Sequence, residues 1–299
     1  ASTHDSILFL TTKGRMFKLK CYEIPEGSRS SMGSHINNLL SLEPGETVSS
    51  IMGVSGFDPT KYVVLVTRRG LIKRTRLDAY KNIRKNGLNA ISLNEGDELV
   101  FSRLTNGECQ LLIATKNGMA IRFDENDVRE MSRTAMGVKA IHLKDGDEVV
   151  GMARVREGAS VMTVTDKGLG RRTAVEDYPL QSRNGLGKIN YKVSEEKGYV
   201  CGVKVVDEDD DLILISNEGV IIRIAVADVR VMSRYASGVR VMRLGENDRV
   251  VTFVRAEHAD GEETEKVEED EGDEASDTAE AEELEREMEA DDAANPQEE

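Results

Sequence analysis

Basic residues recur at two fixed positions in this sequence, and their positive charge is the chemistry that the chain most clearly offers. Both positions are counted from a recurring glycine, one of them four residues and the other fifteen residues after it. The hairpin cations, four residues after the glycine, are Lys18, Arg74, Arg122, Arg172 and Arg223. The loop cations, fifteen residues after it, are Arg29, Lys85, Arg133, Arg183 and Arg234. A solvated strand face would explain the polarity but not the uniform sign, which instead predicts a surface that binds a polyanion.

The glycines themselves mark an internal repeat. They are Gly14, Gly70, Gly118, Gly168 and Gly219, at separations of 56, 48, 50 and 51 residues. A period near fifty residues indicates a repeat architecture. Each glycine follows a hydroxyl residue by three positions, at Thr11, Thr67, Thr115, Thr165 and Ser216, a combination that predicts a tight hairpin turn with the glycine at positive φ. Apolar residues ten positions after the glycine are expected in the core, namely Ile24, Tyr80, Val128, Tyr178 and Val229.

Each repeat is predicted to hold four short strands. In the first repeat they are 7–10, the alternating stretch 15–20, a third strand near 37–42 and a fourth at 48–54. Four strands per repeat is typical of a propeller blade. We therefore expect an all-β, propeller-like domain over residues 1–256, with units at about 5–54, 61–104, 109–155, 159–206 and 210–256, followed by a disordered acidic tail at 257–299.

The charge of the chain is divided unevenly between these two parts. The whole chain carries −15, but residues 257–299 hold 22 acidic and two basic residues, a net of −20. The remaining 256 residues therefore carry +5, so a negative total does not argue against nucleic acid as a partner.

Other site chemistries find little support in the sequence. Cys21, Cys109 and Cys201 are isolated in apolar strands, as expected of reduced thiols in the cytosol, and the four histidines are scattered. We expect no metal site, no cofactor and no catalytic residue. Neither a long apolar run nor an export leader is present, so we expect a cytoplasmic protein without a membrane span.

Several stretches resemble the C-terminal domain of the A subunit of bacterial DNA gyrase. The resemblance covers residues 1 to about 256 and rests on the repeated hairpins, on 3–7, on the stretch 167–179 and on the paired Gly137-Val138 and Gly238-Val239. It implies a β-pinwheel, in which four-stranded blades exchange strands with one another.

The chain departs from that family at one motif. The family's signature box, Gln-Arg-Arg-Gly-Gly-Lys-Gly, is not found intact, and its nearest match is the glycine-rich stretch 181–188. By comparison with the family, the chain is expected to begin at the second blade. The breakage-reunion region with its active-site tyrosine is also absent from this sequence.

The resemblance also implies a function. It predicts non-sequence-specific binding of double-stranded DNA, and its bending around a basic rim, in an ATP-dependent type II topoisomerase that introduces negative supercoils. The implied partners are the remainder of the gyrase A subunit, together with the ATPase (B) subunit. The implied location is the bacterial nucleoid. The expected DNA-binding residues are the hairpin cations, the loop cations and Lys188.

Other functions remain open from the residues. The related topoisomerase IV domain would select DNA crossings, a protein-interaction propeller would show no salt-dependent DNA binding, and a propeller hydrolase would need converging carboxylates or histidines. For the acidic tail, one hypothesis is competition with DNA for the basic rim, and the alternative is a solubilising segment.

Overall fold

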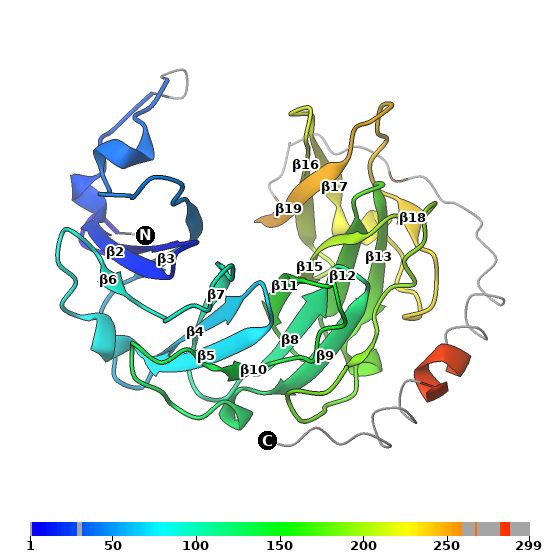
Figure 1. Cartoon of the computed structure of the whole chain (residues 1–299). Helices are drawn as coiled ribbons and strands as arrows, with labels where there is room; N and C mark the ends of the chain where they lie inside the picture. Colours follow the sequence, from blue (N-terminus) through cyan, green and yellow to red (C-terminus); the bar gives the residue numbers. More distant parts are fainter. Residues whose placement is uncertain (1, 29–31, 259–266, 268–281, 288–299) are drawn as a thin grey trace. The chain divides into compact units, whose positions relative to one another are not determined.

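The structure is a computed structural model that describes residues 2–28, 32–258, 267 and 282–287. The chain divides into two compact units (Figure 1). The first contains Ala1–Cys109 and Glu125–Lys139, and the second contains Gln110–Asp124 and Ala140–Glu299. Regular structure in the described residues is almost entirely β-strand, as the sequence predicts.

The first unit holds two antiparallel four-stranded sheets. One has the order β3-β1-β2-β6, with β1 at Ser6–Thr11, β2 at Arg15–Lys20, β3 at Val48–Val54 and β6 at Leu88–Asn89. The other has the order β10-β5-β4-β7, with β4 at Tyr62–Thr67, β5 at Leu71–Arg76, β7 at Leu99–Thr105 and β10 at Val138–Lys139.

The second unit holds two more four-stranded sheets and one of three strands. The four-stranded sheets are β11-β8-β9-β14, with Val149–Arg154, Gln110–Thr115, Met119–Asp124 and Lys188–Ile189, and β15-β12-β13-β18, with Val200–Val206, Ser160–Thr165, Leu169–Ala174 and Val239–Arg240. The three-stranded sheet is β17-β16-β19, with Ile221–Ala225, Asp210–Ser216 and Val250–Glu257.

The hairpin turns form as the sequence predicts. All five turn glycines have φ between +74° and +85°, a region that is open to glycine without steric cost. The hydroxyl three residues earlier accepts a hydrogen bond from the residue after the glycine in every repeat, as in Thr67 with the N–H of Leu71 at 3.1 Å and Ser216 with the N–H of Val220 at 3.3 Å. The side chain thus closes the turn and starts the second strand.

In each four-stranded sheet the strand at one edge, β6, β10, β14 or β18, comes from the next repeat. It is two residues long and follows a second glycine at positive φ, Gly87, Gly137, Gly187 or Gly238. The strand exchange expected from the resemblance is therefore confirmed. In Figure 1, for example, β18 lies beside β13 of the preceding repeat.

One strand prediction was wrong. The stretch near 37–42 is not a strand, because Ile36–Asn38 form a 3₁₀ turn (η2) whose first N–H groups include that of Asn37 bonded to the Nδ1 of His35 at 3.2 Å. The edge of β2 that such a strand would need is taken by β6. Leu40 packs instead with Phe9 and Phe17 in a small apolar cluster.

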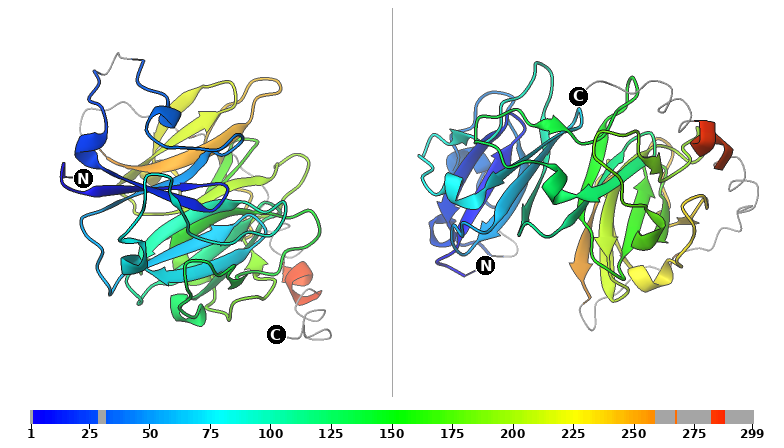
Figure 2. Two further views of the ribbon diagram at one scale, coloured as in Figure 1. Left: turned by 60° about the vertical axis from the view of Figure 1, so that its left-hand side comes forward. Right: turned by 90° about the horizontal axis from the view of Figure 1, so that it is seen from below.

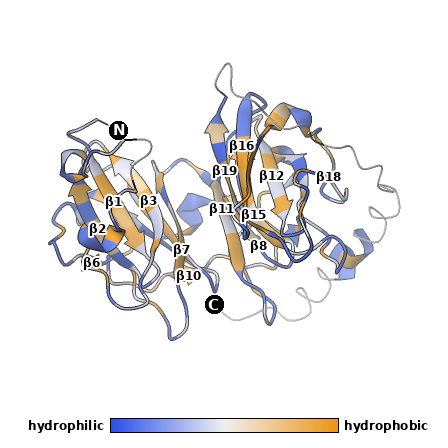
Figure 3. Ribbon diagram, turned by 90° about the horizontal axis from the view of Figure 1, so that it is seen from above, coloured by the Kyte–Doolittle hydropathy of each residue, from blue (hydrophilic) through white to orange (hydrophobic). Residues whose placement is uncertain are grey.

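Apolar side chains between neighbouring sheets form the core of each unit, and Figure 3 shows hydrophobic strands joined by hydrophilic loops. In the first unit Leu8 and Leu10 pack with Val63 and Leu65, and in the second Met162 packs with Leu212 and others. The predicted anchors Tyr80, Val128, Tyr178 and Val229 are buried, and Ile24 is half-buried.

The anchors lie in or beside a short 3₁₀ turn that follows the second strand of every repeat. These turns are η1 (Cys21–Glu23), η3 (Leu77–Tyr80), η4 (Glu125–Asp127), η5 (Val175–Asp177) and η6 (Val226–Asp228). The chain then runs through a loop that carries the loop cation. In the second to fifth repeats this loop ends at the borrowed strand, so the loop cation there is held between two fixed points, the 3₁₀ turn and the pairing with the preceding sheet.

The predicted tail falls mostly outside the described residues. Its described part is Glu257, His258, Val267 and a short helix at 282–287. In the described part of the chain, no helix has the length and apolar character needed to cross a membrane.

Candidate nucleic-acid interface

The hairpin cations of the first unit reach toward the following repeat. Lys18 donates through its Nζ to the carbonyl oxygen of Lys81 at 2.8 Å, just after η3. Arg74 is almost fully buried and donates to the Oδ1 of Asn126 in η4 at 2.7 Å, while its guanidinium lies 4.6 Å from the ring centroid of Tyr62. Both side chains therefore join one repeat to the next.

The hairpin cations of the second unit are similarly engaged. Arg122 donates to the carbonyl oxygens of Val175 at 2.9 Å and Tyr178 at 3.1 Å, which belong to η5 and the residue after it. Arg172 is buried and lies 3.9 Å from a carboxylate oxygen of Glu208. Arg223 pairs with the buried Asp211 at 2.7 Å.

The backbone of the hairpin cations takes part in the same junctions. The carbonyl oxygens of Arg74, Arg122 and Arg172 accept hydrogen bonds from the N–H groups of Met131, Gln181 and Met232 in the following repeat, at 2.8 to 2.9 Å. The Nη1 atoms of Arg74 and Arg122 thus donate to protein acceptors near the place where two repeats meet. This arrangement stabilises the junction and leaves those side chains little surface for an external phosphate.

The loop cations lie nearer to solvent. Lys85 and Arg133 are exposed, and Arg183 is half-exposed, as is Lys188 at the start of β14. Neighbouring loops meet within each unit: in the first, the hydroxyl of Ser92 donates to the carbonyl oxygen of Thr134 at 2.7 Å. Arg29 lies outside the described residues.

Arg234 is a loop cation with several protein contacts. Its guanidinium donates to the carbonyl oxygen of Ile189 at 2.6 Å and to the carboxylate of Glu285 at 2.7 Å. Glu285 comes from the tail helix 282–287, drawn in red in Figure 2, and also accepts from the N–H of Ile189 at 2.8 Å and from the hydroxyl of Tyr235 at 3.1 Å.

The two charges of this pair influence each other's ionisation. Burial raises the pKa of Glu285, but the hydrogen bond and charge of Arg234 outweigh it, so the pKa of this carboxyl is lowered overall. Burial lowers the pKa of Arg234, and the Glu285 carboxylate outweighs it in the opposite direction. A residue of the acidic tail therefore occupies a predicted DNA-binding arginine as an ion pair.

Two further cations, both buried, donate hydrogen bonds to backbone carbonyl oxygens of the loops. Sequence reasoning missed them. Lys73 is fully buried, and its Nζ donates to the carbonyl oxygens of Ala90 and Arg133. Burial, together with the charge of Arg133, lowers the pKa of Lys73 to about 7. This buried amine holds the backbone of a loop cation in place.

Arg171 performs the corresponding task in the second unit. It is fully buried and donates to the carbonyl oxygens of Arg234, Asn190 and Ala236, the last at 2.8 Å, and to the hydroxyl of Thr173 at 3.0 Å. Its position, like that of Lys73, is three residues after the turn glycine, where the other repeats have Phe17, Ile121 and Ile222. The polar exceptions at an otherwise apolar position were the available signal.

More exposed cations share the loops with the predicted ones. Eleven residues after the turn glycine stand Lys81, Arg129 and Arg230, all exposed, and the borrowed strands β10 and β18 end with the exposed Lys139 and Arg240. The sequence did contain a signal for the first three, because this offset holds a basic residue in three repeats and a proline in the other two. These residues widen the positive surface of the loops.

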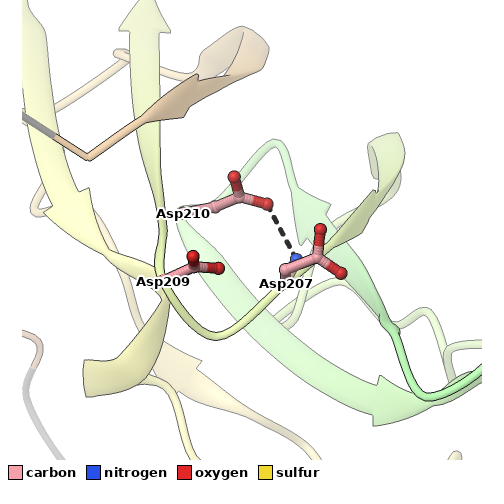
Figure 4. Close-up of side chains that lie close together, drawn as sticks. All are labelled: Asp207, Asp209 and Asp210. Atoms are coloured by element: carbon pink, nitrogen blue, oxygen red, sulfur yellow. Dashed lines mark hydrogen bonds between the residues drawn. The ribbon is translucent and has the colours of Figure 1, made fainter.

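An acidic cluster also went unnoticed in the sequence. Asp207, Asp209 and Asp210 bring their carboxylate oxygens within 4.8 Å of one another at the turn into β16 (Figure 4). The carboxylate of Asp210 accepts from the N–H of Asp207 at 2.7 Å. Arg156 lies 2.7 Å from Asp207, and Arg255 lies 3.2 Å from Asp210, so arginines already balance much of this charge.

Comparison with known proteins relates this geometry to a family. The chain is 52% identical over 264 residues to the DNA gyrase A subunit of Clostridium acetobutylicum and 41% identical over 267 residues to that of Staphylococcus aureus. Each match covers 88% of this chain but only 32% and 30% of the relative, so the chain spans about a third of their length.

Solved structures show the same fold. The C-terminal domain of a DNA topoisomerase IV superposes with a TM-score of 0.79 at 29% identity, covering 85% of this chain and 80% of that one. A DNA gyrase A C-terminal domain superposes with a TM-score of 0.75 at 26% identity, covering 86% and 84%. A family described as "DNA gyrase C-terminal domain, beta-propeller" matches at residues 5–55, 61–106, 110–156, 159–207 and 210–257. The chain belongs to this family of gyrase C-terminal β-propeller domains.

Proposed function

We propose that this chain binds double-stranded DNA without sequence preference and bends it, as the DNA-wrapping part of an ATP-dependent type II topoisomerase of the gyrase type. The observation that supports this most strongly is the position of the loop cations. Lys85, Arg133 and Arg183 stand at the same place in successive repeats, on loops fixed at both ends. Positive side chains at an equivalent position of successive repeats favour binding to a polyanion such as DNA.

Electrostatics supplies most of the binding in this proposal. Each phosphate contact lowers the slope of log affinity against log salt by roughly 0.9 through counterion release. Contacts from Lys85, Arg133, Arg183 and Lys188 would together give a slope of roughly −3.6. Bending a site of 20–30 base pairs costs on the order of 1–6 kcal/mol, which several charge-assisted hydrogen bonds to phosphate can offset.

The hairpin cations take a supporting part in the proposal. Because Arg74, Arg122 and Arg172 are buried or engaged by the next repeat, they position the loops, and Lys18 and Arg223 lie close enough to the surface to add to its potential. Weak sequence preference follows because phosphate contacts do not read bases. We assign no catalytic residue, cofactor or metal ion to this part of the enzyme.

The longer relatives suggest the partners. Proteins that match this chain over most of its length are named as the A subunit of DNA gyrase. We therefore place the chain in that polypeptide, working with the remainder of the A subunit, together with the ATPase (B) subunit. The site of action is then the DNA of the bacterial cytoplasm and nucleoid.

The acidic tail enters the proposal as a competitor of DNA. Glu285 holds Arg234, which is a predicted DNA contact, and the backbone of Ile189, which follows the predicted contact Lys188. A duplex that used Arg234 would have to displace this carboxylate. The tail therefore weakens binding most at low salt, where attraction between exposed charges is strongest.

A second candidate role is the selection of DNA crossings, as in a topoisomerase IV. The structural similarity favours it as much as the first role, because the superposition on the topoisomerase IV domain has the TM-score of 0.79. The two roles predict different results. Wrapping during closure of a DNA circle changes its linking number, whereas crossing selection does not.

Residues 1–299 can be tested with an electrophoretic shift over a salt series and with relaxation of a nicked and religated DNA circle. We expect a salt-dependent shift and a change in linking number. The variant Lys85→Ala/Arg133→Ala should lower the magnitude of the salt slope by roughly 1.8. The control Lys144→Ala/Lys167→Ala removes the same charge from exposed residues outside these loops.

Each result has a distinct meaning. A shift without a linking-number change would favour crossing selection. Equal slopes for the two double variants would show that overall charge, not the loops, binds DNA. Absence of any salt-dependent shift would leave a protein-interaction propeller as the better explanation.

A further inference from the structure

The buried cations Lys73 and Arg171 donate to equivalent backbone acceptors. Each donates to a carbonyl oxygen of its own repeat and to the carbonyl oxygen of the loop cation in the next repeat, which is Arg133 for Lys73 and Arg234 for Arg171. In both places a buried cation is therefore hydrogen-bonded to the backbone of a proposed phosphate contact. The two places differ in one respect, because an arginine keeps its proton whereas a buried lysine can lose it.

The charge of Lys73 is not balanced by an anion. Its side chain is fully buried, and no carboxylate of the described residues pairs with it. The Nζ atom donates instead to two uncharged backbone carbonyl oxygens. Burial of an ammonium group without an anion disfavours its charged form. The pKa of Lys73 accordingly lies at about 7, so both its protonated and its neutral form are populated near neutral pH.

Two ionisable side chains face Lys73 from outside its own sheet. Tyr80 in η3 donates its hydroxyl to the carbonyl oxygen of Ala90, which Lys73 also uses, at 3.2 Å. Burial raises the pKa of this tyrosine to about 12, so it stays neutral. Arg133 is the other, and its positive charge adds to the effect of burial in lowering the pKa of Lys73.

The neighbouring strands of the sheet contribute less. On β4 the residue opposite Lys73 is Leu65. On β10 the charged residue is Lys139, which is exposed and lies opposite Leu71. Within the described part of the chain, Arg133 is thus the charged group that shifts the ionisation of Lys73.

We propose that Lys73 is a positioning residue for the phosphate contact at Arg133 and takes up a proton when phosphate binds there. The inference rests on the proposed function, because it needs Arg133 to contact DNA. A phosphate beside Arg133 offsets the charge that repels the Lys73 ammonium, and it also attracts that ammonium. The protonated form is then favoured, and it holds the carbonyl oxygen of Arg133 more firmly, since charged donors make stronger hydrogen bonds.

Binding and protonation favour each other in this arrangement, because linked equilibria are reciprocal. The affinity for DNA should therefore fall as pH rises through the range in which Lys73 loses its proton. If phosphate raises the pKa of Lys73 by about 0.5 to 1, the affinity above this range is about three- to tenfold lower than below it. The contact of Arg171 with Arg234 should show no such dependence, since arginine stays charged.

The first test needs no DNA. Nuclear magnetic resonance of the chain with labelled lysines follows the titration of Lys73, whose pKa is about 7. Arg133→Gln should raise this pKa, because it removes the repelling charge and keeps a polar side chain. Arg129→Gln is the matched control, since Arg129 is an exposed cation of the same loop, and it should leave the titration in place. An unchanged pKa in Arg133→Gln would overturn the proposal.

The second test measures DNA binding by fluorescence anisotropy with a labelled duplex, at constant ionic strength, from about pH 6 to 9. The unaltered chain should lose affinity over this range. Lys73→Arg introduces the residue that the fourth repeat has at Arg171, so it should keep the affinity of the low-pH form throughout. Lys73→Met should keep the lower affinity throughout. Histidine titration is common to all three chains, so the difference between their profiles belongs to Lys73.

Calorimetric titration in two buffers of different ionisation enthalpy measures the proton uptake directly. At about pH 7.5 the unaltered chain should take up a fraction of a proton per bound duplex more than Lys73→Arg does. Equal uptake, or pH profiles of one shape in all three chains, would overturn the inference and leave DNA binding intact. A chain that binds no duplex at any pH would overturn the proposed function, and this inference with it.

Discussion

The hairpin cations and the loop cations look alike in the sequence and differ in the folded chain. Arg122 is held by carbonyl oxygens of the next repeat, whereas Arg133, from the same repeat, is exposed. Both are arginines at a fixed distance from the same turn glycine, Arg122 in the strand β9 and Arg133 in the loop that follows η4. The difference shows that one recurring charge can stabilise the junction between repeats while the other remains available to a ligand.

The largest expected effect is on the free energy of unfolding. It distinguishes a buried cation that supports the loops from an exposed cation on them. Arg171→Met should lower the free energy of unfolding by at least about 3 kcal/mol, because several buried carbonyl oxygens would lose their donor at about 1–3 kcal/mol each. Thermal unfolding by calorimetry provides the measurement. The exposed Arg133→Met should change stability by no more than about 0.5 kcal/mol, and a similar loss in both variants would contradict the assignment of Arg171 as a brace.

The buried Lys73 should make the stability of the fold depend on pH. Its pKa is about 7 in the folded chain and near 10.4 when unfolded, so between these values the unfolded state binds more protons. Stability should therefore rise with pH in this window, by at most about 1.4 kcal/mol per pH unit. Calorimetry at pH 7, 8, 9 and 10 should show this slope in the unaltered chain and a smaller one in Lys73→Met. Parallel curves would mean that Lys73 stays charged inside the fold.

The same substitution in a hairpin cation and in a loop cation of one repeat tests the comparison directly. Arg122→Met should cost about 1–3 kcal/mol of stability through its lost hydrogen bonds and leave the salt slope of DNA binding unchanged at a temperature where the variant is folded. Arg133→Met should do the reverse, with nearly unchanged stability and a slope smaller by roughly 0.9. If Arg122→Met also reduced the slope, the hairpin cations would touch phosphate after all.

The smallest effect concerns the tail. Glu285→Gln keeps the shape of the side chain and removes the charge that faces Arg234, so DNA affinity at low salt should rise by a few fold, the size expected for a partly exposed ion pair of about 1 kcal/mol. Fluorescence anisotropy with a labelled duplex measures it. Glu287→Gln, an exposed residue of the same helix, is the control, and an equal rise there would point to general charge instead of this contact.

Much of the fold could be predicted from local chemistry. The turn needs a hydroxyl and a glycine at a fixed spacing, and Thr67 and Gly70 recur in equivalent form through the chain, so the hairpins follow. The borrowed strands, such as Leu88–Asn89, are two residues long and carry no alternating pattern of their own. They were expected only through the resemblance, and the error near 37–42 arose because an apolar stretch can pack as a turn as well as a strand.

The candidate site was harder to predict for a related reason. Sign and register of the cations are properties of one repeat, but their exposure depends on the following one. Arg74 is buried and bonded to Asn126, which lies 52 residues away in sequence. The contact of Glu285 with Arg234 spans 51 residues, a distance at which a charge pattern alone cannot identify partners.

Strand lending has a consequence for how such a chain can change in length. A repeat of the sequence does not coincide with a complete sheet. The strands β14 and β18, for example, each belong to one repeat and complete the sheet of the repeat before it. Duplication of one repeat therefore brings a strand for the sheet before it and an edge for the strand after it. Deletion removes both together, so proteins of this type can gain or lose whole repeats in evolution without inventing a new contact.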